Sequence, residues 1–175
     1  PIQLIWTREE DMRTGYYHSI NAQHIEASMD ENGNVTGWLH RAAFPSISTL
    51  FDPSLVRTPA NSLGDVTNHL FGVENMRVES GDAKAHTRIG WYRAVYAIFY
   101  GFSFSSFADE LSYKAGKDPL TFLNQLYDAN DVVEQQEQVS RSKHIIALAA
   151  NKAGWQNRQN LPKGQGIGLV EVFKL

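Results

Sequence analysis

The sequence contains no cysteine. Disulfide bonds, thiolate zinc sites, iron–sulfur clusters and a cysteine nucleophile are therefore excluded within this chain. No apolar run approaches the roughly 20 residues that a membrane-spanning helix needs, and the first residues show no pattern of a basic n-region followed by an apolar h-region. An excess of positive charge is also missing, because 16 basic residues face 19 acidic ones, for a net charge of -3. We therefore expect neither nucleic acid nor a membrane as a partner, and the sequence does not indicate a cellular compartment.

Catalytic and metal-binding signatures are scarce as well. The six histidines form no His-Glu-x-x-His motif, so the sequence predicts no metal site built from side chains. There is no Gly-x-Ser-x-Gly elbow and no Walker loop. The glycines of residues 164–168 resemble part of a phosphate-binding fingerprint, but they precede a predicted strand, so we interpret them as a turn. The adjacent acids Glu9, Glu10 and Asp11 are typical of a solvated face or of a helix start.

The first part of the chain carries strand patterns. A length of 175 residues with 42% hydrophobic content suffices for one compact domain, or for two small lobes sharing a core. Residues 3–8 are apolar and β-branched, which predicts a short buried strand. Ile25, Ala27 and Met29 alternate with polar residues, an Asn-Gly turn signal follows, and residues 35–43 supply a return strand. We therefore predict a β-hairpin here.

Helical patterns dominate the second half. Between Val95 and Ala115, apolar residues recur at three- and four-residue steps, which predicts a helix with a broad buried face. Gly116 is placed as the left-handed cap of this helix. Asp118 and Pro119 are an N-cap and a first-turn proline, and they predict a second, shorter helix. A charged segment, 131–141, then separates it from a further helix that Gly154 ends, and a loop leads into a terminal strand at 169–175.

Strands and helices thus fall into separate blocks, which favours an α+β fold with about three helices over a doubly wound fold. The expected organisation of residues 1–175 is a strand plus hairpin at 1–43, a proline-containing, loop-rich segment at 44–74, a strand and candidate site segment at 75–93, a helical part at 94–154, and a loop with a terminal strand at 155–175.

The stretch Gly90-Trp91-Tyr92-Arg93-Ala94 precedes the long helix. A chain that turns from an extended segment into a helix exposes free N–H donors, and Arg93 adds a fixed cation, so this junction can hold an oxyanion or a phosphate. From the residues alone, another interpretation stays open. The aromatic residues can be core residues before an amphipathic helix, with Arg93 bridging surface carboxylates.

Collinear motifs over nearly the whole chain resemble the molybdopterin-binding large subunit of molybdenum hydroxylases, the family of isoquinoline 1-oxidoreductase, aldehyde oxidoreductase and xanthine dehydrogenase. The motifs are weak individually and fairly specific in their order; residues 44–71 match least well. The matching segments are 1–12, the hairpin with its Asn-Gly turn, 73–79, Gly90-Trp91-Tyr92-Arg93, Phe107-Ala108-Asp109-Glu110-Leu111, Ala115-Gly116-Lys117-Asp118-Pro119, Ala153-Gly154-Trp155 and the glycine loop that leads into the last strand.

The resemblance implies that residues 1–175 are part of a molybdopterin-binding domain. In this family a pterin dithiolene holds the molybdenum, which agrees with a chain that lacks metal-ligand motifs, and the protein supplies positioning and electrostatics. The backbone of Tyr92, Arg93 and Ala94 matches the segment that lies against the metal centre, so these residues are the candidate cofactor contacts. The implied cofactor is molybdopterin, in its cytosine dinucleotide form.

Two departures from the family pattern lie at this candidate site. Where many relatives have a glycine-rich stretch after the arginine, this chain has Ala94-Val95-Tyr96-Ala97-Ile98-Phe99, which implies a looser pterin contact or a remodelled pocket. His18 stands where relatives commonly place an arginine that orients substrate. A histidine there can donate a hydrogen bond, but its charge depends on its surroundings. The alternative for His18 is a partly exposed turn residue.

The resemblance also implies partners. A glycine-rich cofactor loop is expected upstream and a glutamate base downstream, so the partners are the remainder of the large subunit, an iron–sulfur subunit or domain, and a small-molecule substrate. Pro1 and the strand-like end at 169–175 favour an internal piece of a longer protein. We expect that protein to hydroxylate N-heterocycles or aldehydes, and the isolated chain to be inactive and without cofactor.

Two other function classes stay open. The first is a stand-alone binding or interaction module that keeps the fold without the cofactor. The second is a carbohydrate-binding module with an aromatic surface formed by Trp91, Tyr92 and Tyr96.

Overall fold

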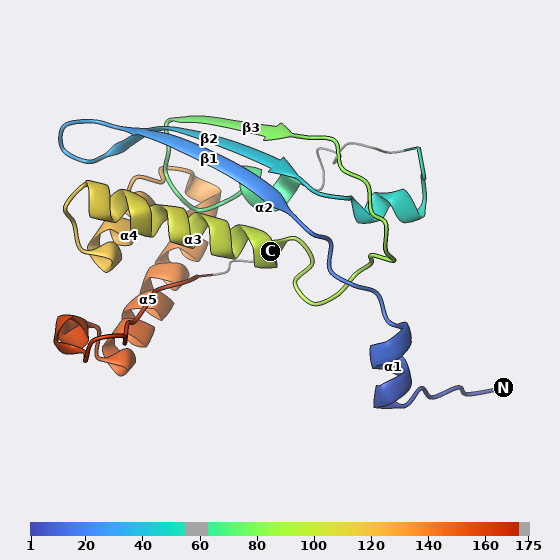
Figure 1. Ribbon diagram of the computed structural model, residues 1–175. Coiled ribbons are helices and arrows are strands. Elements are labelled where there is room, and N and C mark those ends of the chain that lie inside the picture. The colour runs from blue at the N-terminus through green and yellow to red at the C-terminus, as the bar shows by residue number, and fades with distance from the viewer. Residues whose placement is uncertain (55–62, 172–175) are drawn as a thin grey trace.

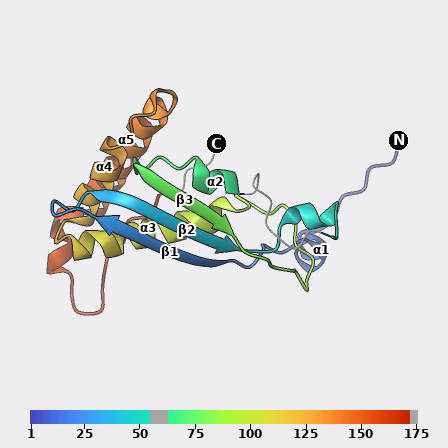
Figure 2. The same cartoon turned by 90° about the horizontal axis from the view of Figure 1, so that it is seen from above.

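The computed structural model describes residues 1–54 and 63–171. Three strands form one layer over helix α3, with α4 and α5 at one end of the molecule and α1 at the other (Figures 1 and 2). The predicted α+β class is confirmed. The elements are α1 (Arg8–Thr14), β1 (Ala22–Met29), β2 (Val35–Ala43), η1 (Ile47–Leu50), α2 (Gly64–Thr67), β3 (Asn75–Ser80), α3 (Ala97–Lys114), α4 (Pro119–Asp128), η3 (Val133–Gln135), α5 (Gln136–Ala153) and η4 (Trp155–Asn160).

The predicted hairpin is confirmed as the antiparallel pair β1–β2, in which Ile25 lies opposite His40. The Asp30 carboxylate organises its turn by accepting hydrogen bonds from the backbone N–H groups of Asn32 (2.9 Å) and Asn34 (2.8 Å). Gly33 follows in the left-handed region, with φ of 71°. The turn is therefore fixed by local chemistry that the sequence displays.

The third strand, predicted at residues 75–79, pairs with β2 in parallel, and the sheet order is β1-β2-β3. A parallel pair needs a crossover connection. The chain between β2 and β3 provides it, and its described parts contain only the short helices η1 and α2. The expected loop-rich character therefore holds for those parts, whereas residues 55–62 lie outside the described residues.

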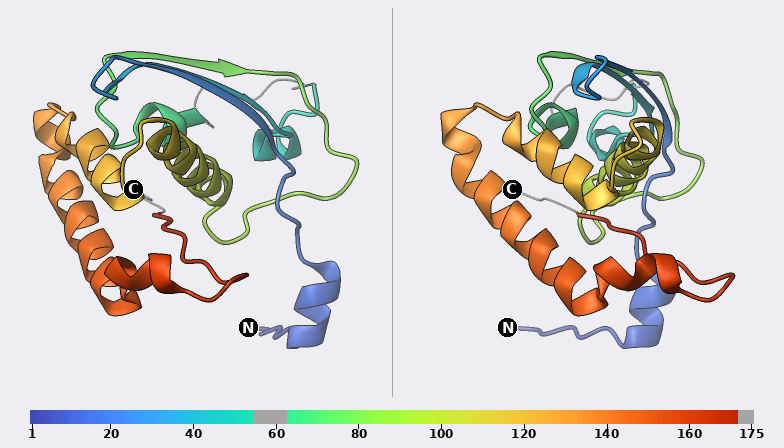
Figure 3. Two further views of the ribbon diagram at one scale, coloured as in Figure 1. Left: turned by 60° about the vertical axis from the view of Figure 1, so that its left-hand side comes forward. Right: turned by 90° about the vertical axis from the view of Figure 1, so that its left-hand side faces the viewer.

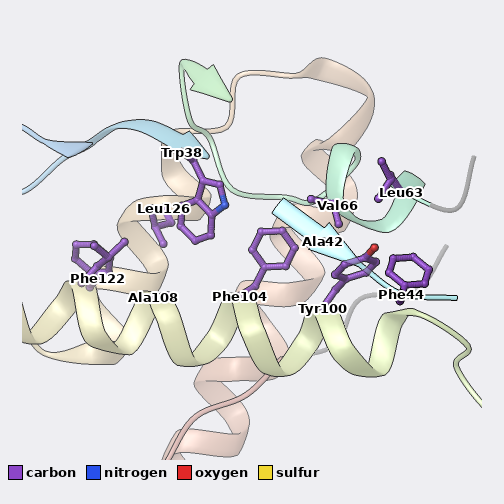
Figure 4. Close-up of a cluster of buried hydrophobic side chains, with 11 residues drawn as sticks. Trp38, Ala42, Phe44, Leu63, Val66, Tyr100, Phe104, Ala108, Phe122 and Leu126 are labelled. Atoms are coloured by element: carbon purple, nitrogen blue, oxygen red, sulfur yellow. The ribbon is translucent and has the colours of Figure 1, made fainter. Parts of the chain in front are cut away.

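The core lies between the sheet and α3. Trp38 points down from β2 and packs against Phe104 of α3, with 5.5 Å between ring centroids (Figure 4). Phe44 and Val66 are fully buried beside them. Burial of side chains of this size contributes about 1.5–3 kcal/mol each, which holds the sheet on α3.

The helix ends agree with the sequence signals. Gly116 and Gly154 follow α3 and α5 with φ of 65° and 69°, as left-handed caps. Asp118 caps α4 by accepting a hydrogen bond from the Thr121 N–H at 3.0 Å. The predicted separating segment 131–141 is wrong in its second part, because α5 already begins at Gln136. The charged side chains of this second part, Glu137 and Arg141, lie on the exposed face of α5.

The predicted strand at residues 3–8 is wrong. These residues lie outside any strand, and the side chains of Leu4 and Ile5 are each 78% exposed. A strand needs a neighbour for its backbone groups, and no other described segment pairs with this one. Thr7 instead caps α1, and Glu9, Glu10 and Asp11 form the first turn of that helix.

At the other end of the chain, residues 169–171 form no strand, and residues 172–175 lie outside the described residues. Figure 3 shows the described chain after η4 returning toward α3. The Glu171 carboxylate accepts hydrogen bonds from Tyr127 (2.9 Å) and Ser142 (3.0 Å). These contacts hold the C-terminal segment against α4 and α5.

Candidate functional site

The candidate site lies where residues 15–18 run beside residues 88–93. Tyr17 and Ile89 form an isolated parallel bridge. The Tyr17 N–H donates to the Arg88 carbonyl at 3.1 Å, and the Gly90 N–H donates to the Tyr17 carbonyl at 3.2 Å. Two segments more than 70 residues apart in the sequence are thereby held side by side.

Arg88 ties α1 to this bridge. Its Nε donates to the Gly15 carbonyl at 2.8 Å, and its guanidinium also donates to the Arg13 carbonyl. The same guanidinium lies over the Tyr17 ring, 5.5 Å from the ring centroid. A cation at the C-terminal end of a helix satisfies free carbonyls and opposes the helix dipole. Arg88 therefore positions α1 relative to residues 88–93.

Gly90 is needed for the close approach of the two segments. A Cβ atom at this position would lie 2.7 Å from the Cβ atom of Tyr16, and closer still to its ring. Such a contact is far shorter than van der Waals separation, so any other residue at position 90 would push Tyr16 away.

A groove of about 620 Å³ opens between α1 and these segments. This volume lies within the range of about 300–1,000 Å³ that is typical of small-molecule sites. His18 and Tyr92 meet at the groove edge to face, with ring centroids 4.8 Å apart. The rings that line the groove, each at least half exposed, are those of Tyr16, Tyr17, Trp91 and Tyr92.

Some charged side chains of the groove have an ion-pair partner and one does not. Arg8 and Asp11 form an ion pair within α1, at 3.9 Å. Arg93 is exposed and makes no ion pair or hydrogen bond with any described residue. The backbone N–H groups of Tyr92, Arg93 and Ala94 likewise donate to no group in the described ranges. The Arg93 guanidinium and the backbone amides of Tyr92 and Arg93, two residues that line the groove, therefore have no partner among the described residues.

The backbone after Arg93 is left-handed at two residues that are not glycine, Ala94 (φ 62°) and Val95 (φ 47°). This conformation costs an L-residue roughly 1–2 kcal/mol, and it is least favourable for β-branched side chains. The chain thus adopts here a conformation that glycine would adopt without strain. Strain of this kind persists where the surrounding structure over-determines the backbone, and it clusters at functional sites.

Contacts on either side hold this backbone in place. The Tyr96 hydroxyl accepts a hydrogen bond from the Ile47 N–H at 2.8 Å. On the side of the sheet, Gln23 donates to the Phe99 carbonyl at 3.3 Å and accepts from Ser103 at 2.7 Å. The start of α3 is therefore anchored to both the crossover connection and β1.

The structure brings together the residues that the sequence singled out. His18, Tyr92 and Arg93 line one groove, and Ala94 follows directly. Tyr96 instead binds Ile47 and does not line the groove, which contradicts the aromatic carbohydrate surface of Trp91, Tyr92 and Tyr96. The proposed bridging of surface carboxylates by Arg93 is also wrong, since Arg93 has no ion pair among the described residues.

Sequence reasoning missed two residues that build the site, Arg88 and Tyr16. Arg88 acts on carbonyls more than 70 positions away, and no local pattern announces such a contact. The close approach of Tyr16 had one signal, the glycine at position 90, because an isolated glycine beside a strand often marks a close backbone approach.

Two further properties limit the chemistry of the described ranges. They hold no group of three or more His, Cys, Asp or Glu side chains that could bind a metal ion. None of their helices combines the length and the apolar composition that crossing a bilayer requires.

Comparison with known proteins gave distant relatives, and no protein-family model matches. The chain is 26% identical over 178 residues to a nicotinate dehydrogenase subunit of Pseudomonas putida, covering 97% of this chain and 14% of that protein. It is 24% identical over 184 residues to the membrane-bound aldehyde dehydrogenase [pyrroloquinoline-quinone] of Gluconacetobacter polyoxogenes, covering 97% of this chain and 24% of that protein. The chain is a distant relative of these oxidoreductases.

The chain spans about a seventh and a quarter of the length of these two relatives. Among solved structures, aldehyde oxidoreductase from Desulfovibrio gigas aligns with 79% of this chain at 14% identity and a TM-score of 0.48. The aligned part is 16% of the aldehyde oxidoreductase chain. A likeness at this level does not by itself establish a common fold. The relation to oxidoreductases therefore depends on the two sequence matches.

Proposed function

We propose that this chain forms part of the molybdopterin-binding subunit of an oxidoreductase that hydroxylates N-heterocycles or aldehydes, and that the groove beside Tyr92 and Arg93 is its part of the site. The observation that carries the proposal is the juxtaposition of His18 with Tyr92 and Arg93 in a groove with free backbone amides. The two relatives, named for nicotinate and aldehyde oxidation, support the substrate class.

The donor set of the groove fits a molybdopterin dinucleotide. The cofactor is a fused pterin ring system with phosphates, and its metal needs no protein side chain as a ligand. The free amides of Tyr92, Arg93 and Ala94 suit an oxyanion, because backbone N–H groups at the approach to a helix are strong anion donors. The backbone at Ala94 and Val95 is left-handed in the absence of glycine.

When bound, the cofactor supplies the oxygen-transfer and electron-accepting chemistry. In this proposal the chain binds and orients. Arg93 and the neighbouring amides hold the anionic parts of the ligand, and Tyr92 fixes the ring of His18. His18 then donates a hydrogen bond to the substrate from the position where relatives carry arginine. The cytosine dinucleotide form and the iron–sulfur partner belong to the proposal.

The test is the metal content of the complete product of the gene that encodes this chain, produced in a host that makes molybdopterin cytosine dinucleotide. We expect about one molybdenum per polypeptide by elemental analysis, together with dye reduction that depends on nicotinate, isoquinoline or an aldehyde. The name of one relative specifies pyrroloquinoline quinone, so the metal-free protein is also incubated with that quinone. A protein without molybdenum that the quinone activates would refute the proposal.

A further inference from the structure

A second cavity lies between α3, the chain that follows α2, and the end of α4. It shares no lining residue with the groove beside Arg93. Its volume is about 50 Å³, which exceeds the roughly 10–15 Å³ that one water molecule needs. It is also well below the roughly 150 Å³ of a cavity that holds benzene. The size therefore suits a molecule of a few non-hydrogen atoms.

The walls of this cavity are mainly aromatic and carry no free charge. The rings of Phe71, Tyr100, Phe104 and Tyr127 line it, and no described lining residue is a lysine or an arginine. The carboxylate among the lining residues, that of Glu171, already accepts hydrogen bonds from Tyr127 at 2.9 Å and from Ser142 at 3.0 Å. An ion would lose its hydration here without gaining a charged partner that is free, which is unfavourable. The cavity therefore favours a neutral ligand.

His69 gives the cavity a hydrogen-bond donor. The backbone N–H of Phe71 donates to Nδ1 of His69 at 3.0 Å. That nitrogen must present its lone pair, so in the neutral ring the proton is on Nε2. Burial lowers the pKa of His69 to about 4, which keeps the ring neutral at pH 7. The buried Nε2 atom has no hydrogen-bond partner among the described residues.

Neighbouring rings fix the direction of this donor. The His69 ring meets the ring of Phe104 edge to face, with centroids 4.7 Å apart, and it packs against Phe71 at 5.4 Å. With Nδ1 also held by the Phe71 N–H, the imidazole has little freedom to turn. A buried donor that lacks an acceptor is unfavourable, so a ligand that supplies an acceptor is stabilised here.

From these contacts we propose that the cavity binds a small neutral molecule that accepts a hydrogen bond from Nε2–H of His69, with the aromatic rings surrounding its apolar part. The recognised chemistry is a single acceptor oxygen or nitrogen on a compact apolar body. Water offers the acceptor without the apolar body, and the experiment separates the two. The proposal does not depend on the groove or on the proposed function.

The experiment is an NMR titration of the 175-residue chain with three probes. Dimethyl sulfoxide is neutral and carries an acceptor, trimethylammonium has a similar shape with a positive charge, and xenon is apolar without an acceptor. Long-range proton–nitrogen spectra report the histidine tautomers. We expect His69 to carry its proton on Nε2, dimethyl sulfoxide to shift that resonance and to displace xenon, and trimethylammonium to do neither.

Two variants separate the donor from the space. His69→Asn keeps an acceptor for the Phe71 N–H and removes the Nε2 donor, and His69→Phe keeps a ring and removes the donor. Each should bind dimethyl sulfoxide about fivefold more weakly, as the loss of one neutral hydrogen bond implies, and each should still bind xenon. His144→Asn changes an exposed histidine of α5 and should bind all three probes as the unchanged chain does.

Three results would overturn the proposal. The first is a proton on Nδ1 of His69, and the second is equal binding of dimethyl sulfoxide by the unchanged chain and His69→Asn. The third is a water contact to Nε2–H that persists at saturating dimethyl sulfoxide, because the cavity would then be a site for water alone. These measurements need no molybdenum. A complete gene product without molybdenum would refute the proposed function and leave this proposal intact.

Discussion

At the scale of single residues, the left-handed pair Ala94–Val95 is the least expected feature of the chain. Its φ angles of 62° and 47° place Cβ atoms where glycine has none. The sequence predicted an altered pocket from the missing glycines. In the structure both residues adopt a left-handed conformation that glycine would adopt without strain.

We expect Ala94→Gly to raise the free energy of unfolding by up to about 1 kcal/mol. Relief of the left-handed strain, roughly 1–2 kcal/mol, exceeds the added entropy of glycine in the unfolded chain, about 0.5–1 kcal/mol. Ala149→Gly, on the exposed face of α5, is the matched control, and we expect it to lower the free energy of unfolding by about 1 kcal/mol. Urea unfolding measures both. Equal losses at the two positions would show that Ala94 is not strained.

A second residue-scale prediction concerns His40 and His69, which lie in the core against Phe104. The pKa of each is lowered from 6.5 to about 4, mainly by burial, and for His40 the nearby His69 contributes to this lowering. Below pH 6.5 the unfolded chain binds protons that the folded chain does not. The free energy of unfolding therefore falls as the pH drops from 6.5 to about 4, by at most about 3 kcal/mol per histidine, and then levels off.

Unfolding in urea at pH 7, 6, 5 and 4 tests this pH dependence. The His40→Gln variant keeps a donor toward Gln23, whose Oε1 lies 2.5 Å from Nε2 of His40. The fall in its free energy of unfolding between pH 6.5 and about 4 should be roughly half that of the unchanged protein. Carboxylates titrate in both proteins, so the comparison isolates the histidine. Identical slopes in the two proteins would contradict the assignment.

At the scale of elements, Arg88 links α1 to the site segment. Arg88→Ala removes both hydrogen bonds to the end of α1, so the amides of Arg8–Thr14 should exchange faster with solvent. Global stability should change by less than about 1 kcal/mol, because the contact is exposed. Hydrogen exchange followed by mass spectrometry is the measurement, with Arg77→Ala as the control. Unchanged protection of α1 would mean that other contacts hold it.

The start of α4 gives a further prediction at this scale. Burial by itself would raise the pKa of the Asp118 carboxyl, but hydrogen bonds from Thr121 and Trp155 and the charge of Arg158 lower it. Asp118→Ala removes the N-cap and leaves Arg158 unpaired, so we expect a loss of about 2 kcal/mol in the free energy of unfolding. Asp118→Asn keeps the cap and should lose less. Thermal and urea unfolding of both variants measure the two losses in the free energy of unfolding. Equal losses would contradict this prediction.

Elements with local signals were predictable and elements that depend on distant partners were not. The Asn32-Gly33 turn, the cap at Asp118 and the glycine after α5 are encoded in neighbouring residues, and the hairpin and helices follow from them. The strand predicted at residues 3–8 lacked a partner, which no local pattern reveals. The parallel pairing of β3 and the role of Arg88 depend on contacts across tens of residues.

At the scale of the whole molecule, the end that carries α1 exposes several apolar side chains. Ile2 is 100% exposed, Met12 is 72% exposed, and Phe51 and Trp91 pack together there with centroids 5.6 Å apart. Exposed apolar clusters of this kind mark contact surfaces. This agrees with the proposal that further protein completes the site around the groove.

We therefore predict that the isolated chain has neither bound molybdenum nor substrate-dependent dye reduction. It supplies walls and donors but not the base expected elsewhere in the subunit. Elemental analysis and a dye assay on the purified chain check this. Stoichiometric molybdenum in the isolated chain would contradict it.

The most direct test of the central claim is the molybdenum content of the complete gene product with Arg93→Gln, measured beside the unchanged protein and Arg77→Gln. The claim predicts near-stoichiometric molybdenum in the unchanged protein and in Arg77→Gln, and at least a severalfold loss in Arg93→Gln at equal folded yield. Equal molybdenum content in all three proteins would contradict a cofactor contact at the groove.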